Sequence, residues 1–209
     1  MKLIMENWKK YLKEQDCNPL QEIQQLIDGN KYLKGKVTAS KETVHDLGDK
    51  YLLMAGVSHI AKRHQEKCFP GSLFSVGEDQ IMQAILNVVK QMPPDGGKVL
   101  AVASGVDNLG IERLVKGDPK QVAALKDYKM KDGTVVKIKP EGDNPGKPTD
   151  RLSVIAPSIG EACGKPVLSL VTAFPGFMGT GKGGPGDIEI KDRKDFAPNG
   201  YYFVIPEKC

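Results

Sequence analysis

The sequence has few of the residues on which metal centres and many active sites depend. It contains only three histidines, one tryptophan and four cysteines among 209 residues. No two cysteines form a Cys-x-x-Cys pair, and none lies beside a histidine at metal-ligand spacing, which argues against a zinc site. We therefore expect neither a bound metal nor a cofactor. Free thiols in a reducing compartment are predicted for all four cysteines, which are Cys17, Cys68, Cys163 and Cys209.

Long hydrophobic runs are also missing. No apolar stretch approaches the roughly 20 residues that a transmembrane helix needs. The first ten residues return to charged side chains too soon for a signal peptide. The sequence thus predicts no membrane contact. It also predicts a protein that works in the cytoplasm, or one that is exported by a route without a cleavable signal.

The charge balance leans slightly basic. Lysine and arginine number 30 against 26 acidic residues, which gives a formal net charge of +4. An excess of this size permits an anionic partner such as nucleic acid without requiring one. With 40% hydrophobic and 27% charged residues, the chain is expected to fold around a core.

Helical patterns occupy the first half of the chain. Residues 3–15 and 19–28 have the apolar spacing of amphipathic helices, and residues 41–63 have a similar but broken apolar face. Ser75 and Glu78 have capping-box spacing, which predicts a further helix that reaches Gln91. Ile81, Ile85 and Val88–Val89 are its expected core face. The first 39 residues read as a helical appendage, and residues 40–209 as the main domain.

The second half is rich in β-branched and aromatic runs bounded by Gly, Pro or Asp. Residues 105–133 and 140–150 are expected to be loops. Helices followed by strands predict an α+β fold with a mainly antiparallel sheet. The expected strands are Lys98–Ser104, Thr134–Lys139, Leu152–Ala156, Val167–Phe174 and Tyr201–Ile205.

One glycine-rich segment resembles a phosphate-binding P-loop but lacks essential parts. Gly176 to Lys182 match its first seven positions. A P-loop needs Ser or Thr after the lysine and a helix that begins there. Gly-Gly-Pro-Gly follows instead, so nucleotide hydrolysis is disfavoured. Two interpretations stay open. The segment is either a flexible loop that offers Lys182 to a phosphate or a solvated loop between two strands.

Two of the histidines, His59 and His64, lie close together, with Lys62 and Arg63 between them. Metal-free ribonucleases need one group to accept a proton and another to donate one, and histidine suits both roles near neutral pH. Cationic neighbours could neutralise the phosphate. On a continuous helix the two rings would point about 140° apart, so the helix must end near Arg63 for both to face one substrate. Favourable interaction with a helix C-terminus is the alternative explanation for both histidines.

Several segments, taken in order, resemble the bacterial EndoU-type nucleases of the barnase–EndoU–colicin–RelE superfamily. They are His59-Ile60 with His64, the turn Phe-Pro-Gly-Ser-Leu-Phe-Ser, the helix from Asp79, and the strand Leu170-Val-Thr-Ala-Phe-Pro175. The resemblance covers about residues 50–176. It implies metal-independent cleavage of RNA, often tRNA, with a 2′,3′-cyclic phosphate product, and an EndoU-like domain over residues 40–209.

The resemblance also implies roles for individual residues. His59 and His64 would be the general base and acid in either order, and Thr172 would donate a hydrogen bond to the scissile phosphate. Phe174 stands where many relatives have Tyr, so it could stack on a base but has no hydroxyl. Lys67 is the nearest candidate for the family's phosphate-binding lysine, with Lys98 or Lys182 as substitutes. Without the resemblance, a strand residue and a core aromatic are the expected roles of Thr172 and Phe174.

Partners follow from the same resemblance. An RNA substrate is expected, together with an immunity or neutralising protein, and the chain would be a delivered toxin or a phage-encoded relative that acts in the producing or the target cell. The alternative hypothesis is an RNA-binding or virion-associated structural protein with the same fold and no catalysis.

Overall fold

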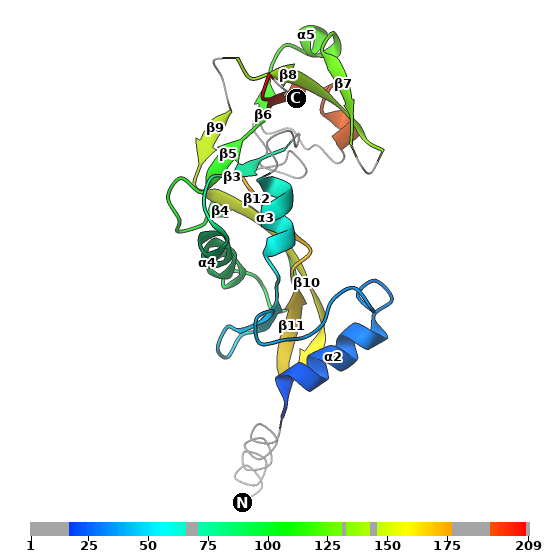
Figure 1. Cartoon of the computed structure of the whole chain (residues 1–209), viewed down its shortest axis with the longest axis vertical. Helices are drawn as coiled ribbons and strands as arrows, with labels where there is room; N and C mark the ends of the chain where they lie inside the picture. The colour runs from blue at the N-terminus through cyan, green and yellow to red at the C-terminus, as the bar shows by residue number, and fades with distance from the viewer. Residues whose placement is uncertain (1–16, 66–70, 131–132, 143–145, 177–192, 208–209) are drawn as a thin grey trace, which may run out of the picture. The chain divides into compact units, whose positions relative to one another are not determined.

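The computed structural model describes residues 17–65, 71–130, 133–142, 146–176 and 193–207 (Figure 1). No helix in these ranges is long and apolar enough to cross a membrane. Short helices and several mostly antiparallel sheets make the fold α+β, as the sequence predicts. The expected helix over residues 3–15 lies outside the described residues.

The chain divides into two compact units. The first comprises residues up to Gly56, Lys90–Lys98 and Ile155–Val171, and the second comprises Val57–Val89, Val99–Val154 and Thr172 onward. The chain passes from one unit to the other within two of its strands, β4 (Gly96–Ala103) and β10 (Arg151–Ala162). The expected division at residue 39 stays a prediction.

The first unit is a small sheet covered by one helix. The helix α2 (Pro19–Gly29) begins at Asn18, whose side chain accepts a hydrogen bond from the Gln21 amide, and has Pro19 in its first turn. Its buried face packs on strands β2 and β11 around a shared apolar cluster. The cluster comprises Ile23, Ile27, Leu52, Met54, Ala162 and Val167.

Strand pairing in this sheet mixes both directions. The strands run in the order β1 (Val44–Asp46), β2 (Leu52–Met54), β11 (Lys165–Ser169) and β10. β1 and β2 form an antiparallel hairpin, β2 pairs with β11 in parallel, and β11 returns antiparallel to β10. The Tyr51 hydroxyl donates a hydrogen bond to the Met92 carbonyl and so attaches this hairpin to the segment after α4.

The second unit contains two further sheets and the remaining helices. One sheet has the order β6 (Leu114–Lys116), β13 (Tyr201–Ile205), β8 (Val135–Pro140) and β7 (Lys126–Lys129). The other has the order β3 (Leu73–Phe74), β5 (Gly110–Glu112) and β9 (Lys147–Thr149). Strand β12 (Thr172–Pro175) pairs with β10. The helices are α3 (Ser58–His64), α4 (Glu78–Val89), α5 (Pro119–Ala123) and the 3-10 turn Arg193–Asp195.

Most of the predicted regular elements are confirmed. The strand expected over Tyr201–Ile205 has those bounds, and α4 buries the predicted face of Ile81, Ile85, Val88 and Val89. The expected strand Val167–Phe174 is two strands, because Leu170 and Val171 interrupt it between β11 and β12.

Two predictions about local structure are wrong. Residues 41–63 do not form a helix: β1, β2 and a turn precede α3, which begins only at Ser58. Residues 105–133 and 140–150 are not loops throughout, because β5, β6, α5, β7 and β9 lie within them. These strands have only three or four residues each, too few to show a period in the sequence.

Candidate functional site

The helix α3 carries three of the predicted site residues. It spans Ser58–His64, and its last turn closes with a hydrogen bond from the Gln65 amide to the Ala61 carbonyl. His59 and Arg63 lie on this helix, but their side chains are outside the described part of the chain, as are Lys67 and Lys182 altogether. His64 is the predicted catalytic side chain on this helix whose surroundings the structure describes.

His64 is held in one orientation by the turn that follows α3. Its Nδ1 atom lies 2.9 Å from the carbonyl oxygen of Ser72, and the side chain is buried, with 3% exposed. A carbonyl oxygen can only accept a hydrogen bond, so the Nδ1 atom carries the proton and donates it. A hydrogen bond of this kind fixes the tautomer and the ring plane.

Two phenylalanines enclose the His64 ring. Phe74 of β3 meets it edge-on with ring centroids 5.9 Å apart, and Phe174 of β12 lies at 6.3 Å and a 30° tilt. Both phenylalanines are buried. Phe174 therefore packs against His64 in the interior. This is the core role that the sequence predicts for Phe174 when the family resemblance is set aside. A base could stack on Phe174 only after its present neighbours had moved.

Thr172 shares a strand face with Phe174. Side chains two residues apart in a strand lie on the same face of the sheet. Strand β12 packs against α3 (Figure 1). Because Phe174 faces His64, we infer from the alternation of the strand that the half-buried Thr172 side chain is on that same face of β12. The fold thus places His64 against the strand that carries both Thr172 and Phe174, although that strand is far from His64 in the sequence.

The end of α3 lies close to where the histidine hypothesis requires it. That hypothesis needs the helix to end near Arg63, so that His64 can turn toward the substrate of His59. The last residue of α3 is His64, one position later, and Gln65 is its C-cap. The His59 side chain lies outside the described part of the chain, so a shared substrate for the two histidines stays a prediction.

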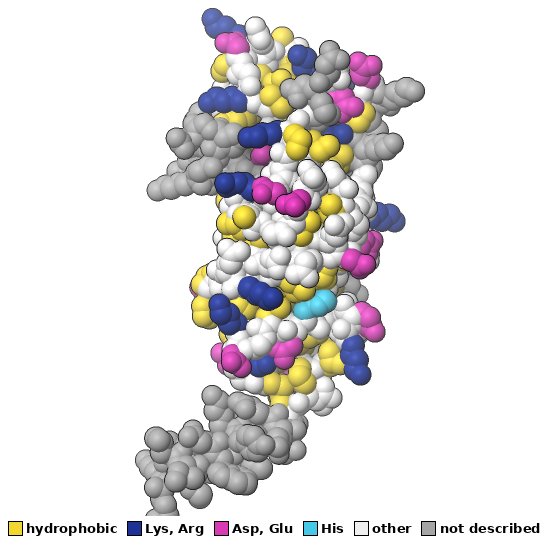
Figure 2. All heavy atoms as spheres, turned by 90° about the vertical axis from the view of Figure 1, so that its left-hand side faces the viewer, with side chains coloured by type: hydrophobic (Ala, Val, Ile, Leu, Met, Phe, Trp, Pro, Cys, Tyr) yellow, Lys and Arg dark blue, Asp and Glu magenta, His cyan; other side chains and the backbone are white. Residues whose placement is uncertain are grey.

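The second unit also has a polar groove that sequence reasoning missed. It has a volume of about 520 Å³ and lies between the loop after β4 and strands β5 and β9. Both signs of charge line it, and on the face that Figure 2 displays Lys and Arg side chains are likewise interspersed with Asp and Glu. The lining residues are Asp107, Asn108, Glu112, Lys147, Pro148, Thr149, Asp150 and Arg151. No pattern in the sequence places these separate segments together.

Arg113 is a buried cation that directly follows Glu112, one of the residues that line the groove. Arg113 is buried between β5 and β6, with its Nη2 atom 3.6 Å from the Glu141 carboxylate. Burial lowers the pKa of the Arg113 guanidinium, and the negative charge of Glu141 partly offsets this effect. The backbone carbonyl of Arg113 accepts a hydrogen bond from the Val204 amide, so the residue also joins β13 to this segment.

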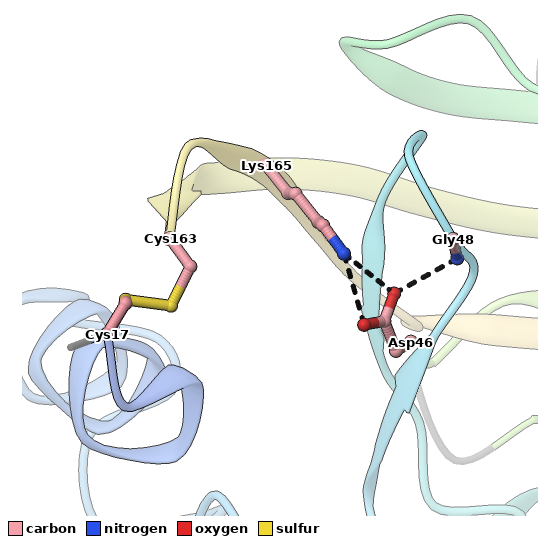
Figure 3. Close-up of polar contacts among 5 residues, drawn as sticks. All are labelled: Cys17, Asp46, Gly48, Cys163 and Lys165. Atoms are coloured by element: carbon pink, nitrogen blue, oxygen red, sulfur yellow. Dashed lines mark hydrogen bonds and ion pairs between the residues drawn. A yellow bond between two sulfur atoms is a disulfide. The ribbon is translucent and has the colours of Figure 1, made fainter. Parts of the chain in front are cut away.

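The prediction of free thiols is wrong for Cys17 and Cys163. They form a disulfide that joins the start of α2 to the turn between β10 and β11 (Figure 3). The Cys163 amide also donates a hydrogen bond of 2.7 Å to the Glu22 carboxylate. Spacing could not reveal this pair, because 146 positions separate the two cysteines.

The disulfide also bears on metal binding. Within the described ranges, the group of potential ligands close enough to share an ion is Cys17, Glu22 and Cys163. Metal ions bind thiolates, and neither sulfur of a disulfide is a thiolate. This group therefore does not fit a metal while the bond is intact.

Comparisons with known proteins do not identify a family for this chain. It matches no protein-family model, no curated protein and no solved structure. The resemblance to EndoU-type nucleases therefore stays a prediction.

Proposed function

We propose that this protein is a metal-independent endoribonuclease in which His64 and Thr172 act on the scissile phosphate. One observation carries the proposal: His64 of α3 packs against Phe174 of β12, the strand that also carries Thr172. The hydrogen bond from His64 Nδ1 to the Ser72 carbonyl adds to this, because an orientated imidazole is what proton transfer requires.

The proposed reaction is a transesterification within the RNA. A base takes the proton from a ribose 2′-hydroxyl, and the 2′-oxygen then forms a bond to phosphorus. The bond from phosphorus to the 5′-oxygen breaks, and an acid gives that oxygen a proton. The products are a 2′,3′-cyclic phosphate and a free 5′-hydroxyl. His64 performs one of the two proton transfers through Nε2, His59 is proposed for the other, and the Thr172 hydroxyl donates a hydrogen bond to a phosphate oxygen.

The disulfide adds to the proposal on localisation. Disulfides persist in oxidising compartments and are rare in a reducing cytosol. The bond between Cys17 and Cys163 therefore favours a chain that is exported before it acts on RNA over one that stays in the cytoplasm. A delivered ribonuclease also needs a neutralising protein in the producing cell, and we include such a partner in the proposal.

The burial of His64 favours a second candidate function. An imidazole with 3% of its surface exposed between two phenylalanines is also what a structural histidine looks like. The alternative is an RNA-binding or structural protein in which His64 only joins α3 to the turn at Ser72. Replacement of the histidine would then lower stability and leave RNA binding intact.

Rates of RNA cleavage by three variants separate the two candidates. His64→Ala and Thr172→Val should each lower the rate in EDTA, His64→Ala by the ~10²–10⁴-fold that acid–base help supplies. The matched control is His45→Gln, which replaces the third histidine, on β1 of the first unit. Thermal unfolding of each variant shows whether it is folded. Folded variants that all cleave at the wild-type rate would refute the catalytic assignment.

A further inference from the structure

Three potential metal ligands meet in the first unit. The sulfur atoms of Cys17 and Cys163 and a carboxylate oxygen of Glu22 all lie within 4.8 Å of one another. Cys17 precedes α2, Glu22 lies in the first turn of α2, and Cys163 lies in the turn between β10 and β11. All three residues are half-buried. The disulfide excludes a metal from this group, so what the group binds depends on whether that bond is present.

The turn that carries Cys163 is one that cysteine does not favour. Ala162 pairs with Lys165 across the hairpin. The two residues between them, Cys163 and Gly164, have φ angles of 53° and 73°. Asn, Asp and Gly dominate at such positions, because most side chains are strained in the left-handed region. A cysteine placed here at a conformational cost indicates that its sulfur atom has a function.

The Glu22 carboxylate is orientated toward the two sulfur atoms and has no cationic partner. Its Oε2 atom accepts a hydrogen bond of 2.7 Å from the Cys163 amide, and hydrogen-bonded carboxylates are typical of metal sites. Lys165, two residues after Cys163, pairs with Asp46 instead (Figure 3). No ion pair within the described ranges includes Glu22. Its negative charge is therefore available to a metal ion.

The dimensions of the group suit zinc once the two sulfur atoms are separate. Zinc binds thiolates at about 2.3 Å and carboxylate oxygens at about 2.0–2.2 Å, in a tetrahedron. The ligand atoms of such a site lie ~3.6–3.8 Å apart, which is within the 4.8 Å that encloses this group. The Cα atoms of Cys17 and Cys163 are 5.6 Å apart, so rotation of the two side chains can open the space. Two thiolates, one carboxylate and a water complete four-fold coordination.

We infer that Cys17, Cys163 and Glu22 form a zinc site when the disulfide is reduced. A thiol reductant supplies the electrons: two of its thiols become one disulfide, the bond between Cys17 and Cys163 breaks, and each cysteine gains a proton. Zinc then displaces these two protons, because the thiolate is the ligand. The ion replaces the covalent link between α2 and the β10–β11 turn. A chain exported in the oxidised form thus keeps this attachment after it enters a reducing cytosol.

Zinc binding by the reduced and the oxidised protein tests the inference. The full chain is reduced with an excess of a dithiol, which anaerobic gel filtration then removes. Zn²⁺ is titrated in competition with a chromophoric chelator. The reduced wild type should bind one ion tightly. The oxidised wild type should bind at least about 100-fold more weakly, because two ligands are missing and each is worth at least about 10-fold.

Two variants and a matched control assign the ligands. Reduced Cys17→Ser/Cys163→Ser should lose the tight site. Glu22→Gln keeps an acceptor for the Cys163 amide but loses the charge, and it should weaken zinc binding by about 10–100-fold. The control Cys68→Ser/Cys209→Ser removes the same number of thiols at other positions of the sequence and should bind as the wild type does.

Thermal unfolding provides a second readout that does not depend on the chelator. Zn²⁺ should raise the Tm of the reduced wild type, because an ion that binds only the folded state stabilises it. The Tm of the oxidised wild type should not change, and the rise should be smaller in reduced Glu22→Gln.

Equal zinc affinity of the reduced and the oxidised wild type would overturn the inference. Tight binding by Cys17→Ser/Cys163→Ser, unchanged affinity in Glu22→Gln, or a loss of binding in the Cys68→Ser/Cys209→Ser control would also overturn it. A reduced chain that is unfolded and does not refold with Zn²⁺ would do the same. The proposed RNA cleavage does not use this ion, so either proposal stands or falls without the other.

Discussion

Replacement of Cys17 and Cys163 by serine should destabilise the folded protein strongly. The disulfide closes a loop between residues 146 positions apart, and it does so inside the first unit. In the chain-entropy description a loop of this length is worth about 5 kcal/mol at 25 °C, and losses of about 2–5 kcal/mol are typical when a native disulfide is removed. Because whole domains are stable by only about 5–15 kcal/mol, this loss should shift the unfolding midpoint by an amount that is easily measured.

Urea unfolding followed by circular dichroism measures this loss. The oxidised wild type is compared with Cys17→Ser/Cys163→Ser, each with and without a thiol reductant. Reductant should lower the free energy of unfolding of the wild type toward that of the variant and should leave the variant unchanged. Equal stability of all four samples, together with alkylation of Cys17 and Cys163 in the untreated native protein, would refute the reasoning.

Two other predictions concern backbone geometry and pH. Gly96→Ala should lower the free energy of unfolding by at least about 2 kcal/mol, because Gly96 has a φ of 66° and its new Cβ atom would collide with the Ala156 carbonyl oxygen. The control is Gly29→Ala, because a Cβ atom at Gly29 would meet open space. This variant should leave the free energy of unfolding unchanged or raise it by up to about 1 kcal/mol. Equal urea midpoints for Gly96→Ala and Gly29→Ala would contradict the prediction. Burial raises the pKa of Tyr201 above the ordinary value of about 10. The neutral Tyr201 side chain therefore stabilises the folded state fully below pH ~10, and this contribution is lost as the pH rises through the raised pKa. Stability should therefore fall above pH ~10, and less so in Tyr201→Phe; identical urea midpoints for wild type and variant from pH 9 to 11.5 would show that Tyr201 does not contribute.

The elements that the sequence predicts well have long and regular apolar patterns. The face of Ile81, Ile85, Val88 and Val89 repeats every three or four residues, and α4 follows it from Glu78 to Val89. Tyr201–Ile205 is an uninterrupted run of β-branched and aromatic residues, and it became a strand at the centre of the four-stranded sheet. In both elements the local preference of the residues agrees with their burial in the fold.

The segment from residue 41 to 63 shows why the rest could not be predicted. Leu52, Leu53 and Met54 are all buried, which is typical of a central strand covered on both faces but also fits one turn of a buried helix. The deciding signal was the turn before them. The Asp46 side chain accepts a hydrogen bond from the Gly48 amide, and Gly48 adopts a φ of 71°, a conformation that ends a helix and suits a hairpin.

The candidate site was predictable only in part. Short motifs in the sequence mark His64, Thr172 and Phe174. The packing of α3 on β12 could not be predicted, because it depends on contacts between segments that are distant in the sequence. The burial of Phe174 against His64 depends on the same contacts and agrees with the core role that the sequence gives Phe174 without the family resemblance; its role in base stacking stays a prediction. The groove at β5 and β9 and the disulfide likewise join segments whose proximity no local pattern encodes.

The most direct test of the central claim is the chemistry of the RNA ends that the protein leaves. Purified wild-type protein, His64→Ala and the control His45→Gln are incubated with total RNA in EDTA, and the fragment termini are analysed. The nuclease proposal predicts 2′,3′-cyclic phosphate ends with wild type and with His45→Gln, and none with folded His64→Ala. Intact RNA in all three reactions, or the same cyclic ends with His64→Ala, would contradict it.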